Sequence, residues 1–294
     1  MYQRLSFSHP SGASFSLTPF GGHLLSYSPP SSPSILWLSS SHITDTTKSI
    51  RGGVPVCFPQ FGRVHDKVSP QHGWARLQTW RVVTKSDSGI VLQISSKDAT
   101  GAGRDGLWPA EGCAFETTLT LEVSLDDDGK LVYVATVKND GDATMPYQLL
   151  LHNYYSVDAQ SDAFGVTGLE GMNVIDTQPR GREGSGQTFY TQSAVPITVD
   201  GEVDRIFHGQ ESELVIGIEP GAGRARINVK VSASNDRPVS CVVWNPYVEK
   251  AKEMGDFDDE GWKQMICVEP GLIDGLQIMK AGEEQTITQT IWID

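Results

Sequence analysis

Apolar and polar residues alternate along residues 115–125, which is the clearest pattern in the chain. Odd-numbered positions from Phe115 to Leu125 carry five apolar side chains and one threonine, while even-numbered positions carry only Glu, Thr and Ser. A period of two predicts a half-buried β-strand. The stretch Asp126–Lys130 contains an Asp-Gly pair suited to a tight turn, and a second strand is expected over 131–138. Residues 115–138 therefore predict a β-hairpin.

Other segments repeat this pattern between Gly, Pro, Asp or Asn clusters, and further strands are expected at residues 90–95, 213–219, 225–233, 239–244, 264–269 and 284–293. This spacing, with almost no long helical pattern, predicts an all-β fold, a large antiparallel sandwich that takes residues 1–294 as one domain. We expect one short helix over Tyr247–Met254, with Asn245 as N-cap, Pro246 in the first turn and Gly255 at its end. Residues 26–41, rich in Ser and Pro, and the Gly-rich residues 179–187 are expected to be surface loops.

Composition restricts the class of protein. The 294 residues include 36 acidic and 23 basic side chains, a net charge of −13, which argues against nucleic-acid binding. No apolar run approaches the length of about 18 residues that a membrane span needs, and residues 1–10 lack the apolar core of a signal peptide. Four scattered cysteines form no C-x-x-C pair and are expected to be buried free thiols. We therefore expect a soluble, cytoplasmic protein.

Charge is distributed unevenly along the chain. Residues 48–81 carry six basic residues and one acidic residue, a net charge of +5, whereas residues 249–260 carry six acidic residues and two lysines, a net charge of −4. A basic segment in an acidic protein indicates a site for a small anion, and a solvated basic loop is the alternative interpretation.

Several chemistries lack their local sequence signatures. The seven histidines form no H-x-H or H-E-x-x-H pair, so no metal site is predicted. The G-x-x-x-x-G-K-S/T motif of nucleotide-binding loops and the G-x-S-x-G motif of serine hydrolases do not occur, and no G-x-G-x-x-G is expected between a strand and a helix.

Two of the remaining segments present arginines beside irregular backbone. In RGGVPVCFPQFG, residues 51–62, paired glycines follow Arg51 and could hold its guanidinium rigidly for a phosphate or for vicinal hydroxyls. A structural turn with Arg51 paired to an acid is equally compatible. In QHGWAR, residues 71–76, polar side chains flank Trp74, which is either a stacking platform for a sugar ring or a core aromatic.

Two further segments each place one titratable group in an apolar strand. His152 interrupts the run of residues 149–157, and an imidazole can give or take a proton near neutral pH, although most such histidines are satisfied core residues. Glu269 ends an apolar strand just before Pro270-Gly271, where it is either paired with an arginine or desolvated and more basic. The two would form a base and an acid, but sequence spacing cannot show that they meet.

Six motifs in order carry a resemblance to a known family: RGGVPVCFPQFG, QHGWAR, LLHNYYSV, VDRIF of residues 203–207, WNPYVEKAKEMGDF and CVEPG. The chain resembles the glucose-6-phosphate 1-epimerases, or hexose-6-phosphate mutarotases, of the aldose 1-epimerase superfamily from roughly residue 17 to residue 293. The resemblance implies a galactose-mutarotase-like β-sandwich with few short helices and interconversion of the α and β anomers of a hexose 6-phosphate. It implies His152 as general acid and Glu269 as general base. The substrate contacts that it implies are Arg51, Gln71, Arg76 and Asp204, with His72 and Trp244 nearby.

The chemistry of anomer exchange agrees with these residue types. Opening a hemiacetal requires a base for the C1 hydroxyl proton and an acid for the ring oxygen, and no cofactor. The scheme needs protonated His152 beside ionised Glu269, and their proximity is expected to favour that ion pair. The basic segment favours a phosphorylated hexose as small-molecule substrate, and we expect a monomer without nucleic-acid or membrane partners. An aldose 1-epimerase acting on free sugars and a non-catalytic carbohydrate-binding module are the alternatives.

Overall fold

The computed structural model describes residues 1–63, 70–99, 115–178 and 187–294, and these residues form three antiparallel sheets. The smallest sheet has the order β1 (Leu5–Ser8), β2 (Ser14–Thr18) and β3 (His23–Ser28).

One large sheet, called here the β17–β18 sheet, has eight strands. Its order is β13 (Thr188–Thr191), β12 (Asn173–Asp176), β14 (Val203–His208), β17 (Ser240–Asn245), β18 (Met265–Met279), β9 (Met145–Leu151) and β4 (Val56–Cys57), with β10 (Tyr154–Ser156) also pairing with β18.

The second large sheet, called here the β8–β19 sheet, also has eight strands. Its order is β11 (Phe164–Thr167), β15 (Glu213–Pro220), β16 (Ile227–Ala233), β19 (Glu284–Ile293), β8 (Leu131–Asn139), β7 (Thr117–Leu125), β6 (Gly89–Ser95) and β5 (Arg81–Lys85). The helices of the described residues are short: η1 (Ala75–Leu77), α1 (Tyr247–Glu253) and η3 (Gly261–Lys263). In this part of the chain, no helix is long and apolar enough to cross a membrane.

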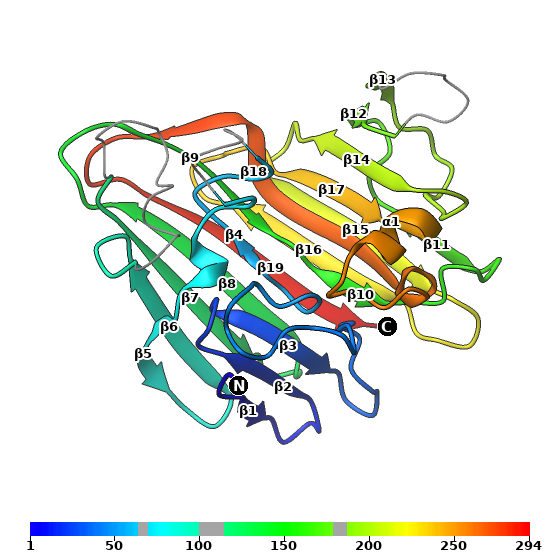
Figure 1. Cartoon of the computed structure of the whole chain (residues 1–294), viewed down its shortest axis with the longest axis horizontal. Coiled ribbons are helices and arrows are strands. Elements are labelled where there is room, and N and C mark those ends of the chain that lie inside the picture. The colour runs from blue at the N-terminus through cyan, green and yellow to red at the C-terminus, as the bar shows by residue number, and fades with distance from the viewer. Residues whose placement is uncertain (64–69, 100–114, 179–186) are drawn as a thin grey trace.

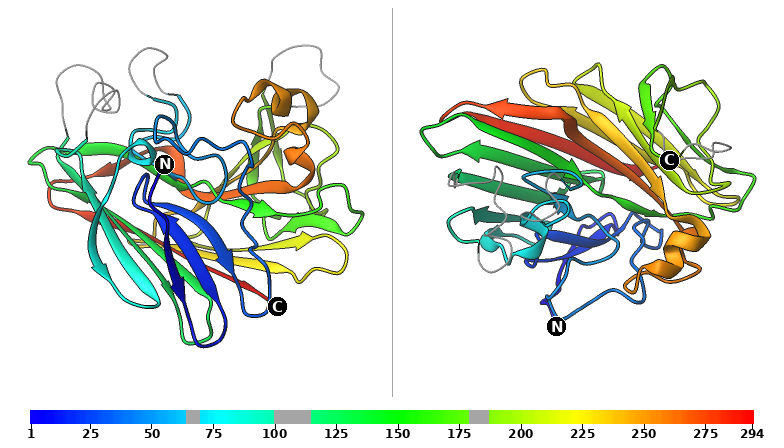
Figure 2. Two further views of the ribbon diagram at one scale, coloured as in Figure 1. Left: turned by 60° about the horizontal axis from the view of Figure 1, so that its bottom comes forward. Right: turned by 45° about the horizontal axis from the view of Figure 1, so that its top comes forward.

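The two large sheets lie against each other as the layers of a sandwich (Figures 1 and 2). One contiguous buried cluster contains Tyr133 and Ile287 of the β8–β19 sheet together with Leu149 and Val268 of the β17–β18 sheet. Phe15 of the small sheet joins the same cluster. Burial of apolar surface between the layers is therefore the main stabilising contribution to the fold, and the predicted all-β sandwich is confirmed.

The hairpin predicted from the alternating pattern is present. Strand β7 pairs with β8 in a register that runs from Thr117 opposite Asn139 to Leu125 opposite Leu131. The intervening turn closes with a hydrogen bond from the Asp126 N–H to the Lys130 carbonyl, and Gly129 adopts a φ of +81°. The other predicted strands appear as β6, β15, β16, β17, β18 and β19.

Strand β18 corrects one expectation. The sequence placed the end of this strand at Glu269, before a Pro-Gly turn, but the strand continues to Met279. Gly271 pairs with Ser240 of β17 on one side and with Leu150 of β9 on the other. A Cβ on Gly271 would lie 2.6 Å from the Leu149 carbonyl oxygen, so glycine serves close strand approach here rather than a turn. Glu269 consequently lies within a central strand.

Residues 26–41 differ from the predicted surface loop. Residues up to Ser28 belong to β3, and Ile35, Leu36 and Trp37 are buried. The Trp37 N–H donates to the Tyr154 carbonyl. The Ser and Pro content indicated a loop, but the apolar residues inside it are covered by the core. The loop expected at residues 179–187 lies outside the described residues except for Gln187.

The predicted helix is α1, and its cap is nearly as expected. The Asn245 Oδ1 accepts a hydrogen bond from the Tyr247 N–H, although the residue at the N-cap position is Pro246. The helix ends at Glu253, two residues before Gly255, and Gly255 does not take a positive φ. Cys57, Cys241 and Cys267 are buried free thiols, as predicted, and Cys113 lies outside the described residues.

Candidate active site

Strand register brings three of the predicted site residues to one face of the β17–β18 sheet. Asp204 of β14 is paired with Trp244 of β17, and Glu269 of β18 is paired with Val242 of β17. Because every second residue of a strand points to the same face, Asp204, Trp244 and Glu269 project together. The periodicity of the sequence cannot reveal this arrangement, since it depends on which strands are neighbours.

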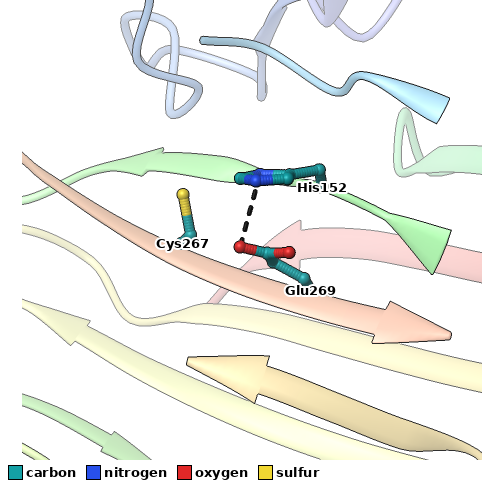
Figure 3. Close-up of side chains that lie close together, drawn as sticks. All are labelled: His152, Cys267 and Glu269. Carbon is teal, nitrogen blue, oxygen red and sulfur yellow. Dashed lines mark ion pairs between the residues drawn. The ribbon is translucent and has the colours of Figure 1, made fainter. Parts of the chain in front are cut away.

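His152 directly follows β9, which neighbours β18 on the side opposite to β17. Its side chain lies beside that of Glu269. Its Nδ1 lies 3.3 Å from Glu269 Oε1, and the two side chains are only 9% and 1% exposed (Figure 3). Within the described part of the chain, neither His152 Nδ1 nor Glu269 Oε2 has a hydrogen-bond partner. The acid and base candidates therefore meet, and both retain unused bonding capacity.

Arg51 is held by an irregular segment, as the paired glycines indicated. Gly52 and Gly53 adopt φ values of +114° and +59°, and a Cβ on Gly53 would lie 2.1 Å from the Leu24 carbonyl oxygen. His23 lies beneath this segment, and its Nε2–H donates to the Gly52 carbonyl over 2.8 Å. A side chain at position 53 would displace the backbone that positions Arg51.

The QHGWAR segment forms a turn that leads into η1. Gly73 adopts a φ of +73°, and a Cβ there would lie 2.0 Å from the Phe58 carbonyl oxygen. The turn orients His72 so that its ring meets that of His152 edge to face at 5.5 Å. Trp74 is fully buried in the core, which confirms the structural interpretation of that aromatic.

These elements enclose a cavity of about 530 Å³, within the range of roughly 300–1,000 Å³ typical of small-molecule sites. All eight residues predicted from the sequence line it: Arg51, Gln71, His72, Arg76, His152, Asp204, Trp244 and Glu269. Sequence reasoning missed other lining residues: Phe61, Gly62, Thr177, Ile206, Val242, Lys250, Glu253 and Met254. Three of these lie in the WNPYVEKAKEMGDF motif, which marked the segment but not the side chains that face the cavity.

Burial opposes the ion pair expected between His152 and Glu269. Burial lowers the pKa of His152 well below its ordinary value, and the guanidiniums of Arg76 and Arg51 lower it further. Burial raises the pKa of Glu269 well above its ordinary value; Asp204 raises it further and Arg76 opposes this. Desolvation therefore shifts both groups toward their neutral forms in the empty cavity.

The two arginines of the cavity have different surroundings. Arg51 forms an ion pair with Asp256, with Nη2 to Oδ1 at 3.2 Å, as its structural interpretation expected, and it also lines the cavity. Arg76 donates from Nη2 to the Gln71 carbonyl, while its buried Nε has no partner among the described residues. Burial lowers the pKa of Arg76, and Arg51 adds to this effect by repulsion. An anion that enters the cavity therefore meets the guanidinium of Arg76, which lacks a carboxylate partner among the described residues.

A third side chain, that of Cys267, lies beside the central pair. Ligand atoms of His152, Cys267 and Glu269 all lie within 4.8 Å of one another (Figure 3), a donor set that Zn²⁺ accepts. The nearby positive charge of Arg76 acts on both His152 and Glu269, and it would repel a divalent cation. The charge of the site therefore fits an anion better than a metal ion.

Buried histidines around the cavity predict a loss of stability in mild acid. Burial lowers the pKa of His23 to about 3, whereas an unfolded chain takes up this proton near 6.5. Between these values the unfolded state binds more protons, so the free energy of unfolding falls as pH falls. Urea unfolding of wild type and H23Q at pH 7.5 and 5.5 should show the variant losing about 1.4 kcal/mol less than wild type over this interval. Equal losses would contradict the assignment, whatever the stability of the variant at pH 7.5.

Fold and site together define a class of protein: a mutarotase-like β-sandwich that holds a buried histidine–glutamate pair in a cavity of small-molecule size. A family model described as Aldose 1-epimerase matches residues 3–292, and the chain belongs to the aldose 1-epimerase family.

Individual relatives agree with this assignment. A protein of Haemophilus influenzae is 41% identical over 273 residues, which cover 92% of this chain and 84% of that protein. A protein of Cenchrus ciliaris is 30% identical over 278 residues, which cover 90% and 77%. Both carry the name "Putative glucose-6-phosphate 1-epimerase".

Solved structures share the fold at low sequence identity. A protein of Salmonella typhimurium described as a "putative mutarotase" has a TM-score of 0.74 at 24% identity, covering 99% of this chain and 90% of that one. A galactose mutarotase-like protein of Lactobacillus casei has a TM-score of 0.71 at 19% identity, covering 99% and 100%. The galactose-mutarotase-like sandwich expected from the resemblance is confirmed.

Proposed function

We propose that this protein interconverts the α and β anomers of hexose 6-phosphates, with glucose 6-phosphate as the preferred substrate. The family supports anomer exchange, and the names of the relatives support a phosphorylated hexose. The observation that supports a phosphate group on the substrate is Arg76, a half-buried cation in the cavity with no carboxylate partner in the described residues. A phosphate oxygen would satisfy both its charge and its free N–H groups.

Glu269 and His152 have complementary roles in the proposed reaction. Ionised Glu269 removes the proton of the C1 hydroxyl, while protonated His152 donates a proton to the ring oxygen, and the C1–ring oxygen bond breaks to give the open-chain aldehyde. Rotation about the C1–C2 bond presents the other face of the aldehyde. The same two proton transfers in reverse close the ring as the other anomer, so protons balance and both residues return to their starting state.

The shift of both groups toward their neutral forms is compatible with this reaction. Neutral His152 with protonated Glu269 holds the same number of protons as imidazolium with carboxylate, and one transfer between Oε1 and Nδ1, which are 3.3 Å apart, converts one form into the other. The guanidiniums of Arg76 and Arg51 are among the causes that lower the pKa of His152. A bound phosphate would neutralise them and so favour protonated His152, the form that donates to the ring oxygen, while Glu269 would lose some of the stabilisation that Arg76 gives to its carboxylate.

The wild-type protein offers a direct test. Magnetisation transfer between the α and β anomeric signals of glucose 6-phosphate in NMR should show faster exchange with protein than without, and a larger effect than on free glucose at equal concentration. Faster exchange of glucose alone would instead indicate an aldose 1-epimerase for free sugars. Exchange at the spontaneous rate for both sugars would exclude the proposed activity.

A further inference from the structure

Tyr154 belongs to the LLHNYYSV motif and lies against the proposed general acid, but it is not among the residues that line the cavity. Its ring stacks on the imidazole of His152 at a centroid distance of 4.8 Å and an interplanar angle of 10°. The ring is 2% exposed, and the edge of Trp244 packs against it at 6.3 Å. The imidazole therefore rests on a flat surface that limits its rotation.

The hydroxyl at the other end of the same side chain contacts an arginine. Arg51 Nη1 donates a hydrogen bond to the Tyr154 hydroxyl over 3.2 Å, while Asp256 holds Nε and Nη2 of the same guanidinium. The ring of Tyr154 thus connects a cation that faces the cavity with the imidazole that faces Glu269. Its backbone is fixed as well, because the Tyr154 N–H donates to the Gly53 carbonyl, two residues after Arg51.

We propose that Tyr154 is a positioning residue with two separable roles: its hydroxyl orients Arg51 toward the phosphate, and its ring orients His152 toward the ring oxygen of the sugar. This inference rests on the proposed function and adds to it a link between phosphate binding and the catalytic imidazole. The two roles lie on different atoms of one side chain, so substitutions can separate them.

The next residue provides a matched control. Tyr155 is buried in the same core cluster as Tyr154, but its hydroxyl has no hydrogen-bond partner among the described residues. The Y155F substitution removes the same hydroxyl group as Y154F, but from the neighbouring position of the same strand. Y155F is therefore expected to keep the KM and kcat of wild type.

Kinetics of anomer exchange with Y154F, Y154L and Y155F distinguish the two roles. In Y154F, the KM for glucose 6-phosphate should rise about three- to tenfold, a larger factor than for free glucose, with little loss of kcat because the ring still supports His152. In Y154L, kcat should fall about tenfold on both sugars. Thermal unfolding of each variant shows whether it is folded, and binding of glucose 6-phosphate by calorimetry in an E269Q background reports the hydroxyl effect without turnover.

Defined outcomes would overturn the inference. A Y154F variant with the wild-type KM for glucose 6-phosphate, or with equal rises for both sugars, would show that the hydroxyl does not orient Arg51 toward the phosphate. A folded Y154L variant with the wild-type kcat would show that the ring does not position His152. Wild-type exchange in the same experiment reports separately on the proposed function, so the failure of one claim is distinguishable from the failure of the other.

Discussion

Replacing Glu269 with glutamine should reduce catalysed anomer exchange of glucose 6-phosphate by about 100- to 10,000-fold, the range typical of a general acid–base residue. Glutamine has nearly the same shape, but its amide cannot accept the C1 hydroxyl proton. Burial raises the pKa of the carboxyl group and favours its neutral form in the empty cavity, and the glutamine amide is neutral as well. We therefore expect E269Q to fold and to bind substrate while exchange falls toward the spontaneous rate.

The measurement is NMR magnetisation transfer, supported by calorimetric binding of glucose 6-phosphate to show that the cavity is intact. E249Q serves as the matched control, because Glu249 lies on α1 with a side chain that is 85% exposed, and it should behave as wild type. H152N should be impaired to a similar degree, and the double variant should be little worse than either single one, since two residues that act as a unit are not additive. Retention of rapid exchange by folded E269Q would remove this residue from the mechanism.

The parts of the fold that depend only on neighbouring residues in the sequence could be predicted. The β7–β8 hairpin follows from strict alternation and an Asp-Gly turn, and the structure has both. Strand β18 does not follow, because Pro270-Gly271 reads as a turn until β9 and β17 are known to flank it. Residues 35–37 were missed for a related reason, since burial of a Ser/Pro-flanked segment depends on distant partners such as Tyr154.

The candidate site was predictable as a set of residues but not as an electrostatic arrangement. All eight side chains predicted from the sequence line the cavity, although eight further lining residues were not predicted. The motifs could not show that Arg51 of the basic segment meets Asp256 of the acidic segment, which lies more than 200 residues later in the chain. The net charge of +5 over residues 48–81 therefore indicated an anion site only in part. The distinction between a paired and an unpaired guanidinium comes from tertiary contacts alone.

From that distinction we expect Arg76 to contribute the larger share of phosphate binding. Replacing Arg76 with glutamine should lower kcat/KM for glucose 6-phosphate by about 100-fold, because a charge-assisted bond to a buried group contributes roughly 1.5–3 kcal/mol. The loss for free glucose should be at least about tenfold smaller, since that substrate presents no phosphate to this guanidinium. Anomer exchange on both sugars with the same preparation gives the ratio directly.

Arg51 provides the comparison, but only if its counterion is removed as well. A single R51Q substitution would leave the Asp256 carboxylate unpaired beside the cavity, where it would repel phosphate and exaggerate the effect of the lost arginine. The double variant R51Q/D256N removes one positive and one negative charge together. Because it leaves the net charge near the phosphate unchanged, it should lose less kcat/KM for glucose 6-phosphate than R76Q does. A larger loss in the double variant, or equal losses of R76Q on both sugars, would show that the unpaired guanidinium does not decide the preference for a phosphorylated hexose.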